Sequence, residues 1–296
     1  MQYEYSVNST GKIVIDSFHF GEKENAEFKK NLEKRLERVE KNISIPFGIH
    51  IKVISRNTFP HSSGIASSAS SMAAFSKMLC LIYDIEDVKI QSIIARLLSG
   101  SACRSLEPGW NLWGETSDVN QSSDQYAISM NQRVHPEFHS LQDWIFVCSR
   151  DVKSLSSSDG HKLMDDHSFL DQRIRNAHGR LKEILKLLEM SPTKDFFEMM
   201  EQEALELHSL MMTSRPPYLL LEPESLMLMK KITSLRNQGV LCGYTLDAGS
   251  SVHLIFPKSQ LGVMSRYFDE GYFGVHGINF TEVLFDECSY DQKLSW

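Results

Sequence analysis

FPHSSGIASSASSMAAF, residues 59–75, sets six serines and one glycine between a proline and an apolar run. Before it, Ile49, Ile51 and Val53 alternate with polar residues, which predicts a strand. After it, residues 70–85 are rich in Ala, Met and Leu and contain no Gly or Pro, which predicts a helix. The stretch therefore connects a strand to a helix N-terminus, where unpaired N–H groups can bind an anion.

The small residues of this connection suit phosphate. Gly64 can adopt backbone conformations that other residues avoid, while Ser62, Ser63, Ser67 and Ser68 offer hydroxyl donors. An N-capping turn with serines of no special role is an equally good interpretation of the local chemistry. The stretch is not a Walker A loop, because it lacks the lysine of that motif.

The composition indicates which classes of protein this chain can belong to. The hydrophobic share of 42% and the charged share of 23% are those of a globular chain of one or two domains. The net charge of −7, without any block of like charges, argues against a nucleic-acid binder. Five scattered cysteines without a CxxC pair predict reduced thiols in a cytoplasmic protein, and neither a signal peptide nor a membrane span is visible.

The first half of the chain alternates strands and helices. Residues 3–7 and 12–18 flank the turn sequence NSTG, which predicts a hairpin of two strands. A helix is expected over residues 24–43, with the apolar positions Phe28, Leu32, Leu36 and Val39 at helical spacing. A further helix is expected over residues 88–98, ending at Ser99-Gly100.

The second half begins with a strand at residues 143–150 and continues with long amphipathic helices over residues 164–236, broken at prolines. Residues 239–256 then predict two strands joined by DAGS, followed by a helix and a final strand. This order predicts an α+β protein of two lobes, with a boundary near residues 150–165.

LLSGSACRSLEPG, residues 97–109, is the second informative stretch. Ser99, Gly100 and Ser101 lie close to Arg104, whose planar guanidinium fits a carboxylate or phosphate. A helix C-cap with a surface salt bridge explains the same residues at least as well. We interpret Cys103 as a small buried thiol and not a nucleophile.

The third informative stretch is TLDAGSSVHLIF, residues 245–256. Asp-Ala-Gly between two apolar strands is typical of a tight turn. The carboxylate of Asp247 could equally be a general base directed into a cleft.

Together the three stretches resemble the diphosphomevalonate decarboxylases of the GHMP kinase superfamily, over residues 45–260. FPHSSGIASSASSMAA is similar to the superfamily's phosphate-binding loop, SGSACRS to the substrate signature of the decarboxylase branch, and TLDAGSSVHLIFP to the motif with the catalytic aspartate. SSSDGHKLM and EALELHSLMMTSRPPY also look like decarboxylase segments.

The resemblance implies a GHMP kinase-like fold. Its N-terminal lobe, over residues 1–155, would resemble ribosomal protein S5 domain 2 and hold the nucleotide, and its C-terminal lobe, over residues 156–296, would be ferredoxin-like. The family's first strand and its Lys-Tyr-Trp-Gly segment have no counterpart in MQYEYSV, and Ser251 stands where the family often has Asn.

The resemblance also implies ATP-dependent decarboxylation of mevalonate diphosphate to isopentenyl diphosphate, with ADP, phosphate and CO₂, in isoprenoid biosynthesis. Asp247 would act on the C3 hydroxyl, and Arg104 would hold the carboxylate or diphosphate with help from Ser99 and Ser101. Mg²⁺ would bridge the ATP phosphates, with Ser68 as its candidate protein ligand, and the protein would be a homodimer. The nucleotide would be held by Ser62, Ser63, Gly64, Ile65, Ala66, Ser67 and Ser68.

Two alternatives stay open at the level of sequence: a GHMP small-molecule kinase that does not decarboxylate, and a truncated or non-catalytic homologue. Four histidines could line the cleft, although structural roles are favoured for all of them: His161, His167, His208 and His253.

Overall fold

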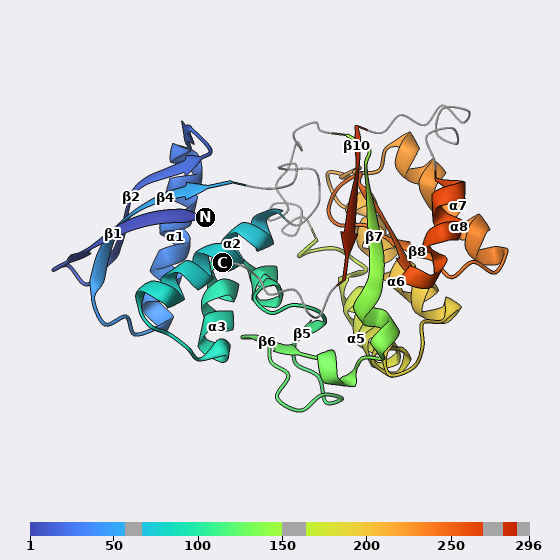
Figure 1. Ribbon diagram of the computed structural model, residues 1–296, viewed down its shortest axis with the longest axis horizontal. Helices are drawn as coiled ribbons and strands as arrows, with labels where there is room; N and C mark the ends of the chain where they lie inside the picture. Colours follow the sequence, from blue (N-terminus) through green and yellow to red (C-terminus); the bar gives the residue numbers. More distant parts are fainter. Residues whose placement is uncertain (57–66, 150–163, 269–280, 289–296) are drawn as a thin grey trace. The chain divides into compact units, whose positions relative to one another are not determined.

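The computed structural model describes residues 1–56, 67–149, 164–268 and 281–288, which form two compact units (Figure 1). Each unit is described by itself. The elements of the first are β1 (Gln2–Asn8), β2 (Ile13–Phe20), β3 (Lys23–Glu24), α1 (Ala26–Asn42), β4 (Gly48–Ser55), α2 (Ser67–Ile82), α3 (Val88–Leu98), a 3₁₀ helix η1 (Gly100–Ser105), β5 (Asn111–Trp113) and β6 (Ala127–Ser129).

The sheet of the first unit has the order β1-β4-β2-β3. The predicted hairpin of β1 and β2 is wrong, because β4 lies between them, antiparallel to β1 and parallel to β2. A β2–α1–β4 crossover produces the parallel pair. The turn between β1 and β2 therefore passes the start of β4, and Gly48 permits this: a Cβ there would lie 2.5 Å from the Lys12 backbone nitrogen and closer still to Asn8 Oδ1.

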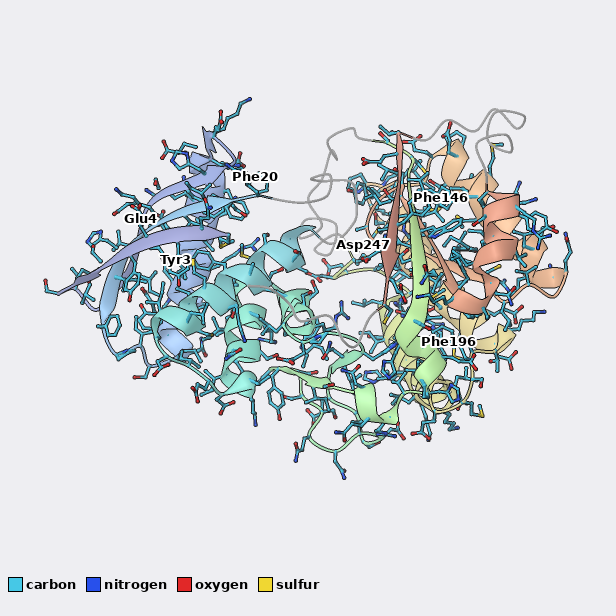
Figure 2. The ribbon with its side chains drawn as sticks, in the orientation of Figure 1. Tyr3, Glu4, Phe20, Phe146, Phe196 and Asp247 are labelled. Atoms are coloured by element: carbon cyan, nitrogen blue, oxygen red, sulfur yellow. The ribbon has the colours of Figure 1, made fainter. Side chains whose placement is uncertain are left out.

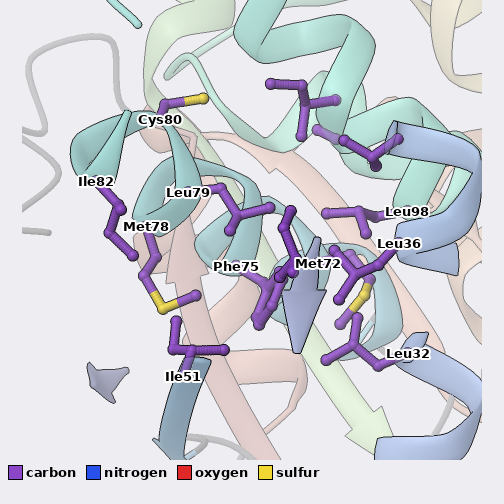
Figure 3. Packing of buried hydrophobic residues seen from close by; sticks show 14 of the residues in the cluster. Leu32, Leu36, Ile51, Met72, Phe75, Met78, Leu79, Cys80, Ile82 and Leu98 are labelled. Atoms are coloured by element: carbon purple, nitrogen blue, oxygen red, sulfur yellow. The ribbon is translucent and has the colours of Figure 1, made fainter. Parts of the chain in front are cut away.

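One apolar core joins this sheet to α1, α2 and α3 (Figure 3). Leu32, Leu36 and Val39 of α1 are all buried, which confirms the helical spacing predicted from the sequence. The alternating strand residues Ile49, Ile51 and Val53 are likewise buried. Met72, Phe75, Met78 and Leu79 of α2 pack against the same core, so the helix that follows the serine-rich stretch is firmly anchored.

The short 3₁₀ helix η2 (Asn131–Arg133) crosses the division between the units. The second unit contains η3 (Pro136–Ser140), β7 (Leu141–Val147), α5 (Leu170–Leu188), α6 (Lys194–Thr213), α7 (Pro223–Asn237), β8 (Gly243–Thr245), β9 (Val252–Pro257), η4 (Lys258–Gln260), α8 (Leu261–Tyr267) and β10 (Glu282–Glu287). The three long helices confirm the amphipathic pattern. Thr193 caps α6 through its side chain, and Pro223 occupies the first turn of α7.

The four strands of this unit are ordered β10-β7-β9-β8, and every pair is antiparallel. In chain order this is 4-1-3-2, with helices between the first and second and between the third and fourth strands. That is the ferredoxin-like arrangement expected from the resemblance. By contacts the units divide after Asn131, earlier than the predicted boundary at residue 155, because β7 pairs with β9 and β10.

Buried polar residues tie the helices of the second unit to its sheet. Arg236 of α7 is paired with Glu201 of α6, with Nη2 and Oε2 2.7 Å apart. The other oxygen of Glu201 accepts the backbone N–H of Tyr244 in β8 at 3.2 Å. Because this buried ion pair also accepts a backbone N–H from β8, it connects β8 to both helices.

In the described part of the chain, no helix is both long and apolar enough to cross a membrane. All five cysteines are free thiols.

Candidate functional site

The N-terminus of α2 lies where the sequence predicted anion binding. The helix begins at Ser67 with no acidic residue in its first turn, and Ser68 and Ser70 are exposed on either side of the buried Ala69. The first N–H groups of a helix have no intrahelical partner, so this end can receive a phosphate. Five residues of the predicted loop lie outside the described part of the chain: Ser62, Ser63, Gly64, Ile65 and Ala66.

The SGSACRS motif forms a tight turn after α3. The N–H of Ser99 donates to Ala95 O at 2.9 Å and ends the α-helix, and its carbonyl accepts the N–H of Ala102 at 2.9 Å to begin η1. Residues three apart eclipse in a 3₁₀ helix, so Ser101 and Arg104 lie on one face. The structure thus brings Ser99, Ser101 and Arg104 together on six consecutive residues.

Arg104 is exposed and available to an anion. Its guanidinium carbon lies 5.9 Å from the centroid of the Trp113 ring, and no described carboxylate pairs with it. The surface salt bridge of the alternative interpretation is therefore not seen among the described residues. Trp113 is itself held, since its Nε1 donates to Asp124 O at 2.9 Å, and a Cβ on Gly100 would come within 3.1 Å of its ring.

Cys103 is the small buried thiol that the sequence predicted. It is buried, as is its neighbour Ala102, and its Sγ donates to Gly100 O at 3.1 Å. Burial raises its pKa to about 11, against the opposing charges of Arg104 and Arg96. The thiol is therefore protonated at neutral pH and does not serve as a nucleophile.

Asp247 lies on the turn between β8 and β9 and is exposed (Figure 2). Its two neighbours Leu246 and Ala248 are buried, so Asp247 is the exposed residue among these three. The backbone carbonyl of Asp247 accepts the N–H of Gly249 at 2.7 Å. A short side chain on an anchored turn can be presented in a defined position, as a general base requires.

Helices α6 and α7 hold this turn from two sides. His208 of α6 is buried, and its Nε2 lies 3.1 Å from the carbonyl oxygen of Asp247. Ser225 of α7, also buried, donates its hydroxyl to the carbonyl of Ser250 at 2.6 Å. Sequence reasoning named His208 only as a candidate for the cleft and missed Ser225, because nothing in a helical pattern shows which turn a buried polar residue reaches.

His253 follows the turn on β9 and is paired with a carboxylate. Its Nδ1 lies 2.9 Å from Asp143 Oδ2 on β7. Burial opposes the charged imidazole, but the hydrogen bond and charge of Asp143, with smaller contributions from Asp247 and Asp286, raise the pKa of His253 above its usual value. Of the other histidines, His167 Nε2 lies 2.9 Å from Thr213 Oγ1, while His161 is outside the described residues.

The candidate residues belong to both units: Ser68, Ser99, Ser101 and Arg104 to the first, and Asp247 to the second. No group of three or more His, Cys, Asp or Glu side chains that could hold a metal occurs in the described ranges.

Comparison with known proteins matches each of the two units to a family model. The model of the diphosphomevalonate decarboxylase-like N-terminal domain matches residues 3–127, and that of the mevalonate 5-diphosphate decarboxylase C-terminal domain matches residues 144–285. A diphosphomevalonate decarboxylase from Ganoderma lucidum is 29% identical over 84% of this chain. The chain spans 67% of that relative's length, and 61% and 64% of the relatives from Candida albicans and Debaryomyces hansenii.

Solved structures show the same fold. The mevalonate diphosphate decarboxylase from Legionella pneumophila is 26% identical with a TM-score of 0.73, covering 95% of this chain and 87% of its own. The enzyme from Enterococcus faecalis, in a structure that concerns ATP binding mediated by mevalonate diphosphate, is 22% identical with a TM-score of 0.75, covering 97% and 84%. A further structure, with a TM-score of 0.76, 22% identity and coverage of 97% and 84%, is a complex with MVAPP, AMPPCP and magnesium.

These likenesses confirm the α+β GHMP-type fold that the resemblance implied. Two family models together match most of the chain, and one of them covers each of the two units. The chain belongs to the diphosphomevalonate decarboxylase family.

Proposed function

We propose that this protein catalyses the ATP-dependent decarboxylation of mevalonate diphosphate to isopentenyl diphosphate, with ADP, phosphate and CO₂ as the other products. The observation that carries the proposal is the exposed carboxylate of Asp247 on an anchored turn, within a domain of this family. Arg104 within SGSACRS supports it from the first unit, since it is exposed and pairs with no carboxylate of the described residues.

The chemistry explains why phosphorylation is needed. A tertiary hydroxyl is a poor leaving group, and transfer of a phosphoryl group from ATP to the C3 oxygen converts it to a good one. When the C3–O bond then breaks with its electrons, the electron pair of the bond to the carboxylate forms the new C=C bond, and CO₂ is released. Asp247 would orient the C3 hydroxyl or accept its proton during the transfer.

The remaining residues would bind and neutralise the anionic groups. Arg104 can hold a carboxylate or phosphate at two points, with the hydroxyls of Ser99 and Ser101 as further donors. The serine loop and Ser68 at the start of α2 would hold the ATP phosphates. Mg²⁺, when bound there with Ser68 as its candidate protein ligand, would neutralise charge that develops during the transfer, as phosphoryl transfer generally requires.

The fit of the nucleotide to this end of α2 rests on the absence of acidic residues from its first turn and on the exposure of Ser68. The protein as a whole is negatively charged, at −7, so local donors must offset an unfavourable background field for so anionic a pair of ligands. A homodimer is part of the same proposal, and sedimentation of the purified chain would test it.

The experiment combines two product measurements. The purified chain is incubated with mevalonate diphosphate, ATP and Mg²⁺, and ADP and CO₂ are measured in parallel. We expect equal amounts of both. ADP formed without CO₂ would instead indicate a small-molecule kinase. Neither product, together with no change in melting temperature on addition of Mg-ATP, would indicate a homologue that is not an enzyme.

A further inference from the structure

The backbone that carries Asp247 is held by a buried histidine from a distant helix. His208 and Asp247 are separated by 39 positions in the chain, yet the ring nitrogen Nε2 and the carbonyl oxygen lie 3.1 Å apart. Because a carbonyl oxygen can only accept, Nε2 must carry the proton and donate it. The contact therefore fixes which ring nitrogen of His208 is protonated.

The surroundings of the contact leave little freedom to the turn. Ala248, next to Asp247, packs in an apolar cluster with Leu210 and Met211 of α6 and with Tyr218. On the far side of the turn, Ser250 O receives the hydroxyl of Ser225, whose oxygen in turn accepts the backbone N–H of Glu222 at 3.2 Å. The turn is thus fastened at both ends by buried donors, while the Asp247 side chain itself stays exposed.

We propose that His208 is a positioning residue for Asp247: its hydrogen bond to the Asp247 carbonyl fixes the peptide that aims the carboxylate, and Ser225 completes the clamp. The proposal rests on the proposed role of Asp247. It assigns His208 no contact with substrate. A displacement of about 1 Å at a reacting group can lower the rate on the order of a hundredfold. Loss of the hydrogen bond from His208 should therefore lower mainly kcat.

The chain offers a graded set of variants. His208→Leu fills the space and removes the donor, whereas His208→Gln places an amide N–H near the position of Nε2. We expect kcat to fall by about tenfold or more in His208→Leu, with little change in KM for ATP, and to recover largely in His208→Gln. His178→Gln, an exposed histidine of α5, is the matched control and should leave kcat unchanged.

A double-substitution test separates the clamp from general structural support. If His208 acts through Asp247, adding His208→Leu to Asp247→Asn should lower the residual turnover by much less than it lowers that of the parent. An equal fold-loss in both backgrounds would overturn the inference while leaving the role of Asp247 intact. A normal rate in Asp247→Asn alone would instead overturn the proposed role of Asp247, and the positioning role of His208 with it.

A physical readout covers the case in which turnover is too slow to measure. Amide hydrogen exchange of residues 246–251 should accelerate in His208→Leu and return toward the parent rate in His208→Gln. If His208→Leu fails to fold, the same comparison uses Ser225→Ala, which removes the donor to Ser250. Unchanged exchange in the turn with a folded variant would show that the hydrogen bond does not hold it, and the inference would fail.

Discussion

The turns at residues 99–105 and 246–251 each present one charged side chain among small residues, but they are built differently. In the first, Cys103 and Ala102 anchor a 3₁₀ helix, and the exposed Arg104 lies beside the Trp113 ring. In the second, two helices hold the backbone on both sides of Asp247. The long arginine keeps its freedom to adjust to a ligand, whereas the short aspartate is placed by its backbone.

This difference predicts different kinetic roles. A flexible cation that neutralises an anion contributes to binding before and during the reaction, so its loss should raise KM as well as slow the reaction. An acid–base group matters only as bonds change, so its loss should lower kcat. The predictions below use this contrast, from the largest expected effect to the smallest.

Asp247→Asn should have the largest effect. The substitution keeps the size and much of the hydrogen bonding of the side chain but removes the negative charge and the base. We expect kcat to fall by about a hundredfold or more, with nucleotide binding and melting temperature nearly unchanged, since Asn is also accepted in turns. Steady-state rates and thermal unfolding check this. A marked fall in melting temperature with full turnover of the folded fraction would reduce DAGS to a structural turn.

Arg104→Lys should have the next largest effect. Lysine keeps the charge but loses the planar two-point fork, and a lost charge-assisted hydrogen bond is worth about 1 kcal/mol or more. We therefore expect kcat/KM for mevalonate diphosphate to fall by about tenfold, with part of the loss in KM. Kinetics that match those of the parent would show that Arg104 is an ordinary surface residue.

The sequence predicted those parts of the fold that depend on local patterns and missed a part that depends on distant pairing. The burial of α1 and β4 and the breaks between the long helices were predictable, because hydrophobic periodicity and proline act locally. The hairpin of β1 and β2 was predicted wrongly, because pairing with β4 is decided by the β2–α1–β4 crossover and by the close approach at Gly48. Local turn residues carry no information about a strand that inserts later.

The residues of the candidate site divide in the same way. Asp247 and Arg104 could be named as candidates from motifs, because small residues around one charge are visible in a single stretch of sequence. The contacts of Trp113, Ser225 and His208 that support them could not be predicted, because these contacts join residues that lie 9, 25 and 39 positions apart in the chain. In the sequence, a buried histidine is visible only as a polar residue on the apolar face of a helix. The fold is needed to show which carbonyl it contacts.

Substitutions of Trp113 test whether the Arg104 side chain is free to adjust to a ligand, as the comparison of the two turns implies. A cation–π contact at an exposed site is worth about 0.5–1 kcal/mol, so Trp113→Leu should lower kcat/KM by about two- to fivefold. Trp113→Phe keeps an aromatic face and should lose less. Both are compared by steady-state kinetics, with melting temperatures to monitor the lost hydrogen bond to Asp124. A loss as large as that of Arg104→Lys would mean that the ring places the arginine, and the contrast between the two turns would disappear.

His253 gives the smallest expected effect, on stability rather than on rate. Burial opposes the charged ring, but Asp143 on β7, with Asp247 on the turn and Asp286 on β10, outweighs it and raises the pKa of His253 in the folded protein above that of the unfolded chain. The imidazolium therefore adds stability that is complete below the unfolded pKa, about 6.5, and that is lost as the pH rises through the folded pKa. His253→Gln lacks this contribution at every pH. Urea unfolding at pH 5.5 and pH 8.5 should show a larger difference between parent and variant at the lower pH. An equal difference at both would mean that Asp143 holds a neutral ring, and that the sheet beside Asp247 carries no titrating charge from His253.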